Sequence, residues 1–255
     1  VAADLRGNGR IELVFGSESG TLYCLDDSGK VLWRRQRHGA VRGIPAVARV
    51  GEGPDLRIFA TFGGGAEACF DADGNVVWEF EEGLPAAERR SGLVVGDLNG
   101  DGRLEVVSAT EDYQVIARDA ATGVERWRFQ GAGKIDQTCS FALADFDGDG
   151  RLDVVGGDSS GRVYRIRDGE AVWTAETGGG IVQGPAVGDV DGDGALEVLV
   201  CSRSDRLLCL DGQTGAVKWD FKTPAGPLST PALGDVTGDG RVEILFTSKD
   251  QFVYC

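Results

Sequence analysis

An acidic, glycine-rich stretch recurs along the sequence at nearly constant intervals, and this repeat limits the folds open to the chain. It reads DLNGDGRLEVV from Asp97, DFDGDGRLDVV from Asp145, DVDGDGALEVL from Asp189 and DVTGDGRVEIL from Asp235. A weaker copy begins at Asp4, and the matching position of the second repeat is Arg49. The six starting points lie 45, 48, 48, 44 and 46 residues apart. Such a period is typical of β-propeller blades and of some helical arrays.

The residues between the acidic turns have the composition of short strands. In the fifth repeat, GPAVGD, LEVLVCS, DRLLCLD and AVKWDF are apolar runs bounded by Gly, Asp or Ser. No segment shows a sustained helical period. The sequence therefore predicts an all-β fold, a six-bladed β-propeller of four-stranded antiparallel blades. One domain, residues 1–255, would hold repeats at approximately 1–40, 41–88, 89–136, 137–180, 181–226 and 227–255.

The tryptophans recur with the same period, and the sixth repeat lacks both its tryptophan and its fourth strand. All five fall in the predicted fourth strand, at Trp33, Trp78, Trp127, Trp173 and Trp219. An aromatic ring at one fixed place per blade can dock against the next sheet, so we interpret these residues as structural. The sixth repeat stops at its third strand, and we expect the last blade to be incomplete in this chain. Residues before Val1 in a longer parent polypeptide are expected to cover its open edge.

The acidic turns have the donor spacing of a calcium loop. Oxygen-bearing side chains occupy positions 1, 3, 5 and 9 and glycines occupy positions 4 and 6, as at the start of an EF-hand loop. Asp and Asn oxygens suit calcium better than zinc, which favours His and Cys. The three complete sets, with the position-7 carbonyl included, are Asp97, Asn99, Asp101, Arg103 and Glu105; Asp145, Asp147, Asp149, Arg151 and Asp153; and Asp189, Asp191, Asp193, Ala195 and Glu197.

Two further copies are incomplete. The sixth repeat offers Asp235, Thr237, Asp239, Arg241 and Glu243, in which the threonine would use its hydroxyl or a water. The first repeat keeps Asp4, Asn8 and Glu12, but Arg6 at position 3 is expected to weaken or abolish binding. Asp-Gly and Asn-Gly also form ordinary turns without metal. Repetition of the intact ligand set favours calcium as the cofactor.

These turns resemble the D-x-D-G-D-G-x-x-D/E loops of the FG-GAP (integrin α-type, VCBS) repeat family. The segments DGQTGAVKW from Asp211 and DAATGVERW from Asp119 are similar to the docking motif of quinoprotein-like propellers. The resemblance implies calcium-bearing blades, and ligands that are other proteins or glycans. Two departures stand out: the second repeat lacks the ligand set, and the fourth has Arg167 where other repeats have Asp.

Charge and cysteine content restrict the possible partners and compartments. A net charge of −15 argues against binding nucleic acid. No apolar run approaches the roughly 20 residues that span a bilayer, so membrane insertion by this chain is not expected. Cys24, Cys69, Cys209 and Cys255 occupy equivalent places and are interpreted as small buried side chains. Unpaired cysteines favour a reducing compartment. Calcium loops favour an extracellular, cell-surface or periplasmic location, and this second argument is the stronger.

The loops opposite the acidic turns vary between repeats, and a variable face is the usual binding face of a repeat protein. Residues expected there are Arg42, Arg89, Arg90, Lys134, Asp136 and Gln183, although each is equally consistent with a solvated loop residue. We therefore predict a non-catalytic binding or scaffolding module of a larger polypeptide, with a protein or glycan partner on that face. The alternatives are a propeller enzyme, quinoprotein-like or polysaccharide-cleaving, and an intracellular sensor domain. His38 is the only histidine, and no nucleophile–base set is visible.

Overall fold

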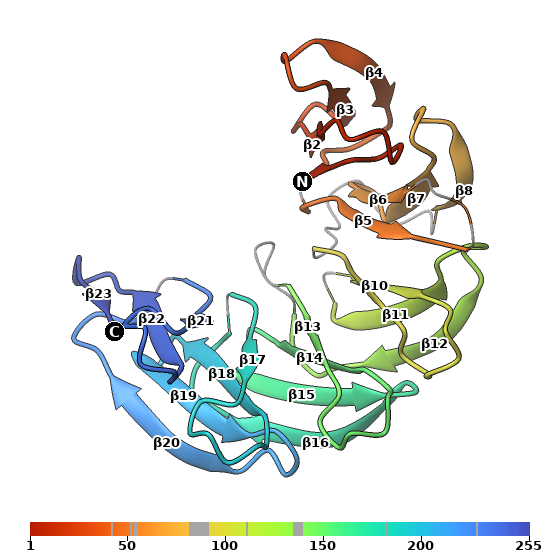
Figure 1. Ribbon diagram of the computed structural model, residues 1–255. Helices are drawn as coiled ribbons and strands as arrows, with labels where there is room; N and C mark the ends of the chain where they lie inside the picture. The colour runs from red at the N-terminus through yellow and green to blue at the C-terminus, as the bar shows by residue number, and fades with distance from the viewer. Residues whose placement is uncertain are drawn as a thin grey trace. The chain divides into compact units, whose positions relative to one another are not determined.

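The computed structural model describes residues 1–41, 43–51, 53, 56–81, 92–110, 112–134, 140–181, 183–227 and 229–255. They form two compact units, Val1–Arg128 and Phe129–Cys255, each built around three antiparallel sheets (Figure 1). Within the described residues, five sheets have four strands in chain order and the last sheet has three. The predicted all-β fold with an incomplete sixth blade is therefore confirmed. We number the sheets blades 1 to 6 along the chain.

The first unit contains blades 1 to 3. Blade 1 consists of β1 (Ala2–Ala3), β2 (Glu12–Gly16), β3 (Thr21–Leu25) and β4 (Val31–Gln36). Blade 2 consists of β5 (Ala46–Arg49), β6 (Leu56–Phe62), β7 (Ala66–Phe70) and β8 (Val76–Glu81). Blade 3 consists of β9 (Val94–Gly96), β10 (Glu105–Ala109), β11 (Gln114–Asp119) and β12 (Glu125–Gln130). The inner strands β5 and β9 lie beside each other.

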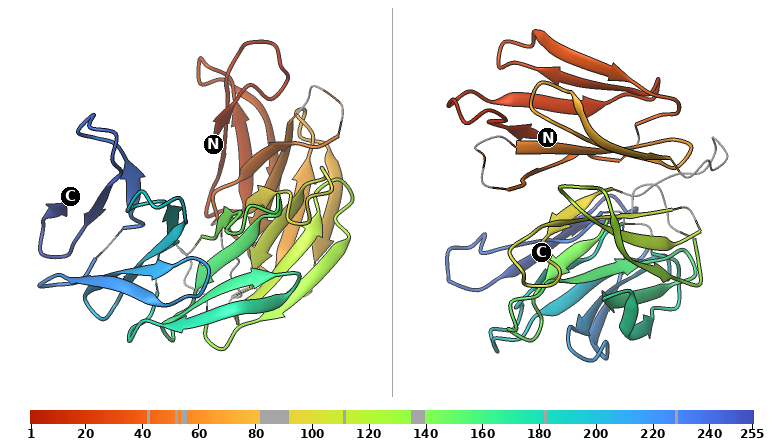
Figure 2. Two further views of the ribbon diagram at one scale, coloured as in Figure 1. Left: turned by 60° about the horizontal axis from the view of Figure 1, so that its bottom comes forward. Right: turned by 90° about the vertical axis from the view of Figure 1, so that its right-hand side faces the viewer.

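The second unit contains blades 4 to 6, drawn in green to blue in Figure 2. Blade 4 consists of β13 (Ala142–Ala144), β14 (Asp153–Gly157), β15 (Arg162–Arg167) and β16 (Glu170–Glu176). Blade 5 consists of β17 (Ala186–Gly188), β18 (Glu197–Ser202), β19 (Arg206–Asp211) and β20 (Val217–Lys222). Blade 6 consists of β21 (Ala232–Gly234), β22 (Glu243–Thr247) and β23 (Val253–Tyr254). None of the described residues forms a helix long and apolar enough to cross a membrane.

The hydrophobic core lies between neighbouring blades. The second strands β10, β14 and β18 are buried along their whole length, and β18 contributes to a core cluster with blade 4 and to another with blade 6. One core cluster joins Leu22 and Trp33 of blade 1 to Ile58 and Phe70 of blade 2. A burial pattern without alternation is typical of strands covered on both sides. Within each unit, neighbouring blades therefore stabilise one another.

The cysteines lie opposite the tryptophans across the third and fourth strands. Cys24 pairs with Trp33 and Cys69 pairs with Trp78, and a β-bulge follows at the same place in both blades. These cysteines form no disulfide and are fully buried. Burial raises the pKa of the Cys24 thiol to about 11 and that of the Cys69 thiol to about 12. Such thiols are inert, which agrees with their interpretation as small packing residues. The same interpretation is wrong for Cys255, which is exposed.

Three tryptophans dock on the following blade through one hydrogen bond. The indole N–H donates to a carbonyl oxygen at 2.9 Å in each case, in the pairs Trp33–Ala72, Trp78–Ala120 and Trp173–Gly212. These rings are at most 9% exposed, whereas Trp219 on β20 is 38% exposed. In the described residues, blade 6 has no turn between a third and a fourth strand to cover the Trp219 ring. The docking role predicted for the tryptophans is confirmed for these three.

We predict that Gly74→Ala destabilises the chain more than Gly29→Ala. Both glycines have a positive φ, which costs an L-residue about 1 kcal/mol. A Cβ at Gly74 would lie 2.6 Å from Trp33 Cδ2, whereas a Cβ at Gly29 meets no described atom within 4 Å. Overpacking adds about 1–3 kcal/mol, and only Gly74→Ala should show it in chemical denaturation. Equal losses in the two variants would contradict the docking role of Trp33.

Candidate metal centres

The first aspartate of each acidic turn holds the turn in shape. Asp97 Oδ1 accepts the Gly100 N–H at 2.8 Å and its Oδ2 accepts the Gly102 N–H at 2.8 Å. The same pair of hydrogen bonds to the glycines at positions 4 and 6 recurs at Asp145, Asp189 and Asp235. These glycines have φ between 73° and 88°, which explains their place in the motif. The local sequence therefore shapes the turn.

The last carboxylate of the turn begins the second strand and reaches back. Its oxygen accepts the backbone N–H of position 2 in the pairs Glu12–Leu5, Glu105–Leu98, Glu197–Val190 and Glu243–Val236, at 2.8 to 3.0 Å. Glu105 and Glu197 are each 1% exposed. The first residue of the second strand, Glu105 or Glu197, therefore places a buried carboxylate beneath a loop that is otherwise exposed.

The third turn has a buried oxygen atom that faces negative charge. Glu105 Oε1 has no hydrogen-bond partner among the described residues. Burial raises the pKa of Glu105, the Leu98 N–H lowers it, Asp101 and Asp97 raise it further, and the Arg126 charge lowers it. An orphaned, buried carboxylate oxygen in a turn with two further aspartates is what a hard cation would satisfy, but the oxygens of Asp97, Asp101 and Glu105 are not among the sets that lie within 4.8 Å of one another. This donor set fits calcium.

The carboxylates of the fifth turn surround a lysine. Lys218, on β20, places Nζ 2.6 Å from Asp191 Oδ2, 2.9 Å from Glu197 Oε1 and 3.7 Å from Asp193 Oδ2. Hydrogen bonding to Lys218 lowers the pKa of Asp191. Oxygens of Asp189, Asp191 and Glu197 lie within 4.8 Å of one another, close enough to share an ion. The long lysine stem allows the ammonium group to leave.

The sixth turn gathers carboxylates from one loop and one strand. Oxygens of Asp235, Asp239 and Glu243 lie within 4.8 Å of one another. The N–H of Gly240, foremost among several backbone donors, lowers the pKa of Asp235. Thr237 Oγ1 donates to Glu243 Oε1 at 3.4 Å, so the threonine hydroxyl lies at this cluster. Ion pairs found in the described residues bring no basic side chain to it.

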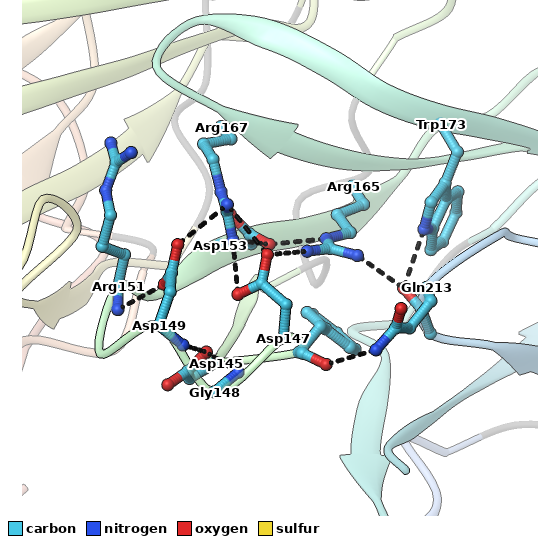
Figure 3. A network of polar contacts seen from close by, with 12 residues as sticks. Asp145, Asp147, Gly148, Asp149, Arg151, Asp153, Arg165, Arg167, Trp173 and Gln213 are labelled. Carbon is cyan, nitrogen blue, oxygen red and sulfur yellow. Dashed lines mark hydrogen bonds and ion pairs between the residues drawn. The ribbon is translucent and has the colours of Figure 1, made fainter.

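The fourth turn holds two arginines from β15. Oxygens of Asp145, Asp147 and Asp149 lie within 4.8 Å of one another. Arg167 Nη1 lies 3.0 Å from Asp147 Oδ2 and 3.2 Å from Asp149 Oδ2 (Figure 3). The Arg167 Nε also donates to Asp153. Here the sequence motif is complete, but the cluster already contains cationic groups.

The first two turns differ further from the motif. Arg6 Nη1 pairs with Glu12 Oε1 at 2.9 Å, and its Nη2 pairs with Asp73 Oδ1 of blade 2 at 2.9 Å. Arg49 Nη1 donates to the Gly53 carbonyl oxygen at 3.0 Å. Weakened binding at the first turn stays a prediction, and this geometry supplies a reason for it.

The position-7 residues contribute backbone hydrogen bonds to their turns. Their N–H groups donate to the position-5 aspartate at 2.8 to 2.9 Å, from Arg103, Arg151, Ala195 and Arg241. Their carbonyl ligation stays a prediction. The repeat pattern identified Arg167 only as a departure from the motif, and it assigned no role to Arg165 or Lys218. The signal for Lys218 was a basic residue directly before the fourth-strand tryptophan.

The residues predicted for the opposite face are described only in part. Arg42, Arg89, Arg90 and Asp136 lie outside the described residues. The Lys134 N–H donates to Ser159 Oγ at 3.2 Å, and the Ser159 N–H donates to the Lys134 carbonyl oxygen at 2.8 Å. Ser159 lies between β14 and β15, at the end of blade 4 opposite its acidic turn, and Lys134 is exposed there. Gln183 follows Ile181, which pairs with Ser202 at the corresponding end of blade 5.

Comparison with known proteins agrees with this geometry. Residues 97–156 and 145–200 match the FG-GAP-like repeat family. No curated protein sequence matches the chain.

Solved structures match along most or all of the chain. BBS1N in complex with ARL6DN is 14% identical with a TM-score of 0.69, covering 100% of this chain and 77% of that chain. BamB from Moraxella catarrhalis is 17% identical and has a TM-score of 0.51. The match covers 95% of this chain and 80% of the BamB chain. The C-terminal domain of Pseudomonas aeruginosa PilY1 is 17% identical and has a TM-score of 0.59. The match covers 81% of this chain and 58% of the PilY1 chain. These neighbours are β-propellers, and at such identities they show the fold alone. The chain therefore carries FG-GAP-like repeats, matched over residues 97–200, within a β-propeller fold.

Proposed function

We propose that the chain is a non-catalytic β-propeller module that binds a protein or glycan partner and is stabilised by calcium at its acidic turns. The observation that carries the calcium part is Glu105 Oε1, which is buried without a hydrogen-bond partner among the described residues. The negative charges of Asp97 and Asp101 raise the pKa of Glu105, because they disfavour its ionised form. A divalent cation would convert this repulsion into attraction.

The third turn offers a complete ligand set by sequence and a buried carboxylate oxygen without a hydrogen-bond partner among the described residues. Asp97, Asn99, Asp101 and Glu105 would hold the ion, with the Arg103 carbonyl as a further donor. The sixth turn would use Asp235, Asp239 and Glu243 with the Thr237 hydroxyl. At the fifth turn calcium would first displace the Lys218 ammonium group, so binding there should be weaker. Bound calcium supplies charge neutralisation and a rigid connection between first and second strands.

The partner-binding part of the proposal is supported by the two ends of each blade. Acidic turns and the turns between third and fourth strands occupy one end, while variable loops occupy the other. BBS1N, which shares the fold, was solved in complex with ARL6DN. The single histidine, His38, favours binding over catalysis for this chain. We therefore propose the loop face that includes Lys134 as the binding site for a protein or glycan ligand.

Calcium dependence also bears on the compartment. Loops of this type respond to calcium at extracellular concentrations, so we propose an extracellular, cell-surface or periplasmic module. The buried free cysteines weigh little against this location, because burial raises the pKa of the Cys201 and Cys209 thiols to about 12, whereas Cys255 is exposed. Thiols that stay protonated and buried resist oxidation.

We expect calcium to raise the melting temperature of the chain. Each site adds about 2.7 kcal/mol when calcium is a hundredfold above its dissociation constant. For a chain of this size, that corresponds to roughly 5–10 °C. Thermal melts in millimolar calcium, in millimolar magnesium and in excess chelator would measure the shift. The Asp97→Ala and Asp235→Ala variants should each lose part of it. Identical melts in calcium and chelator would exclude the calcium proposal.

Glu105→Gln should have opposite effects with and without calcium. The glutamine oxygen can still accept the Leu98 N–H, and its NH₂ group can donate toward Asp97 or Asp101. In chelator the variant should therefore be more stable than the wild type by about 1 kcal/mol. In calcium it should lose one ligand and show a smaller calcium-induced shift. The control is Glu18→Gln, an exposed position, which should change neither melt. A stabilisation that is equal in both conditions would refute the role of Glu105.

Reversal of charge on the loop face should abolish partner binding. The probes are a glycan array and a displayed random-peptide library, each screened with the wild-type chain in calcium. Lys134→Glu should lose at least tenfold in affinity for the selected ligands. Lys30→Glu, which makes the same charge change in the exposed turn between β3 and β4 at the acidic-turn end, should keep the affinity. The reverse ranking would place the binding face at the acidic turns.

A further inference from the structure

The fourth turn differs from the others in what occupies its carboxylate cluster. The two terminal nitrogens of Arg167 each donate two hydrogen bonds. Nη1 donates to Asp147 at 3.0 Å and to Asp149 at 3.2 Å. Nη2 donates to Asp147 at 3.2 Å and to Asp153 at 3.0 Å. Its Nε donates to the other Asp153 oxygen. Figure 3 shows the guanidinium group among these three carboxylates. The oxygens that would bind a metal are already used as hydrogen-bond acceptors.

A change in the neighbouring hairpin explains why an arginine can stand at this position. In blades 3 and 5 the equivalent residues are Asp119 and Asp211, which lie opposite Glu105 and Glu197. Each of these aspartates accepts N–H and hydroxyl hydrogen bonds from the loop between the third and fourth strands.

Blade 4 replaces that loop with a two-residue turn. Asp168 and Gly169 have φ of 51° and 82°, as in a type I′ hairpin. Such a turn needs no capping carboxylate from the preceding strand. Position 167 is therefore free to carry a side chain that points to the acidic turn.

A second arginine makes the arrangement difficult to displace. Arg165 Nε lies 2.5 Å from Asp153 Oδ2, and these side chains are 4% and 0% exposed. Arg165 also donates to the Gly212 carbonyl oxygen of blade 5 at 3.2 Å and stacks over Phe146, 4.7 Å from the ring centre. Asp153 is shorter by one methylene than the glutamates at position 9 of the other turns. Its carboxylate therefore lies within the reach of both guanidinium groups.

We infer that the fourth acidic turn uses the Arg167 guanidinium group as its permanent cation and binds no calcium, although its sequence motif is complete. This inference rests on the proposal that other acidic turns bind calcium. The contrast with the fifth turn is physical. Lys218 is one flexible ammonium group that can move into solvent, whereas Arg167 is held by several directed bonds beside the buried Arg165–Asp153 pair. Blade 4 and its packing on blade 5 would then remain folded when calcium is removed.

Counting bound calcium in the full chain tests the inference directly. Equilibrium dialysis with radioactive calcium would compare the wild type with Asp145→Ala and Asp97→Ala, which remove the same ligand from the fourth and third turns. Asp97→Ala should lose one calcium per chain and Asp145→Ala should lose none. Loss of one calcium from a folded Asp145→Ala variant would overturn the inference.

A stability measurement in chelator covers the case in which a turn variant does not fold. Arg167→Gln should lower the melting temperature by on the order of 5–10 °C, because it leaves the buried Asp153 carboxylate with one partner fewer. The matched control is Arg162→Gln on the same strand, where the 2.8 Å ion pair with Glu176 is exposed. It should lose no more than about 2 °C. Equal losses in the two variants would overturn the inference.

The same experiments separate this inference from the calcium proposal. If the wild type binds calcium and Asp145→Ala binds as many ions, both statements stand. If the wild type binds none, the calcium proposal fails, and the comparison of Arg167→Gln with Arg162→Gln in chelator alone decides whether Arg167 is the cation of the turn. Arg167→Gln should also gain one calcium ion per chain, since it frees the carboxylates.

Discussion

Each acidic turn depends on the hydrogen bonds that its first aspartate accepts from two backbone N–H groups. In the third turn these bonds run from Gly100 and Gly102 to Asp97. They close the loop tightly, and the position-9 carboxylate enters from the start of the second strand. The same geometry that shapes the turn therefore crowds several negative charges together. Positive charge is needed to relieve that crowding, and the way it is supplied differs from blade to blade.

The chain meets this need with different cations. The first turn uses Arg6, the fourth uses Arg167 with Arg165, and the fifth uses Lys218. These side chains come from three different places: the turn itself, the third strand and the fourth strand. The third turn keeps a buried glutamate oxygen without a hydrogen-bond partner among the described residues, which a bound metal ion would satisfy.

Calcium dependence would then be unequal along the chain. Blades share their hydrophobic cores, and an indole N–H hydrogen bond ties each docked tryptophan to the next blade. A blade whose turn carries its own arginine can keep its shape at low calcium and support its neighbour through this contact. In blade 4 that support is visible, since Arg165 and Trp173 both donate to the Gly212 carbonyl oxygen of blade 5. Binding of a partner at the opposite face would require only that the loops there keep their spacing.

The sequence by itself determined the number of repeats, the all-β class, the strand order and the docking of Trp33, Trp78 and Trp173. These properties follow from strand patterns and turn residues that are local and are repeated along the chain. Only the tertiary structure decided which acidic turns contain a cation of their own. Arg167 lies 14 residues beyond Asp153, and Lys218 lies 27 residues beyond Asp191. Strand pairing and the length of the hairpin before the fourth strand bring these charges together. The nine-residue motif of the acidic turn includes neither feature, so it could not predict these ion pairs.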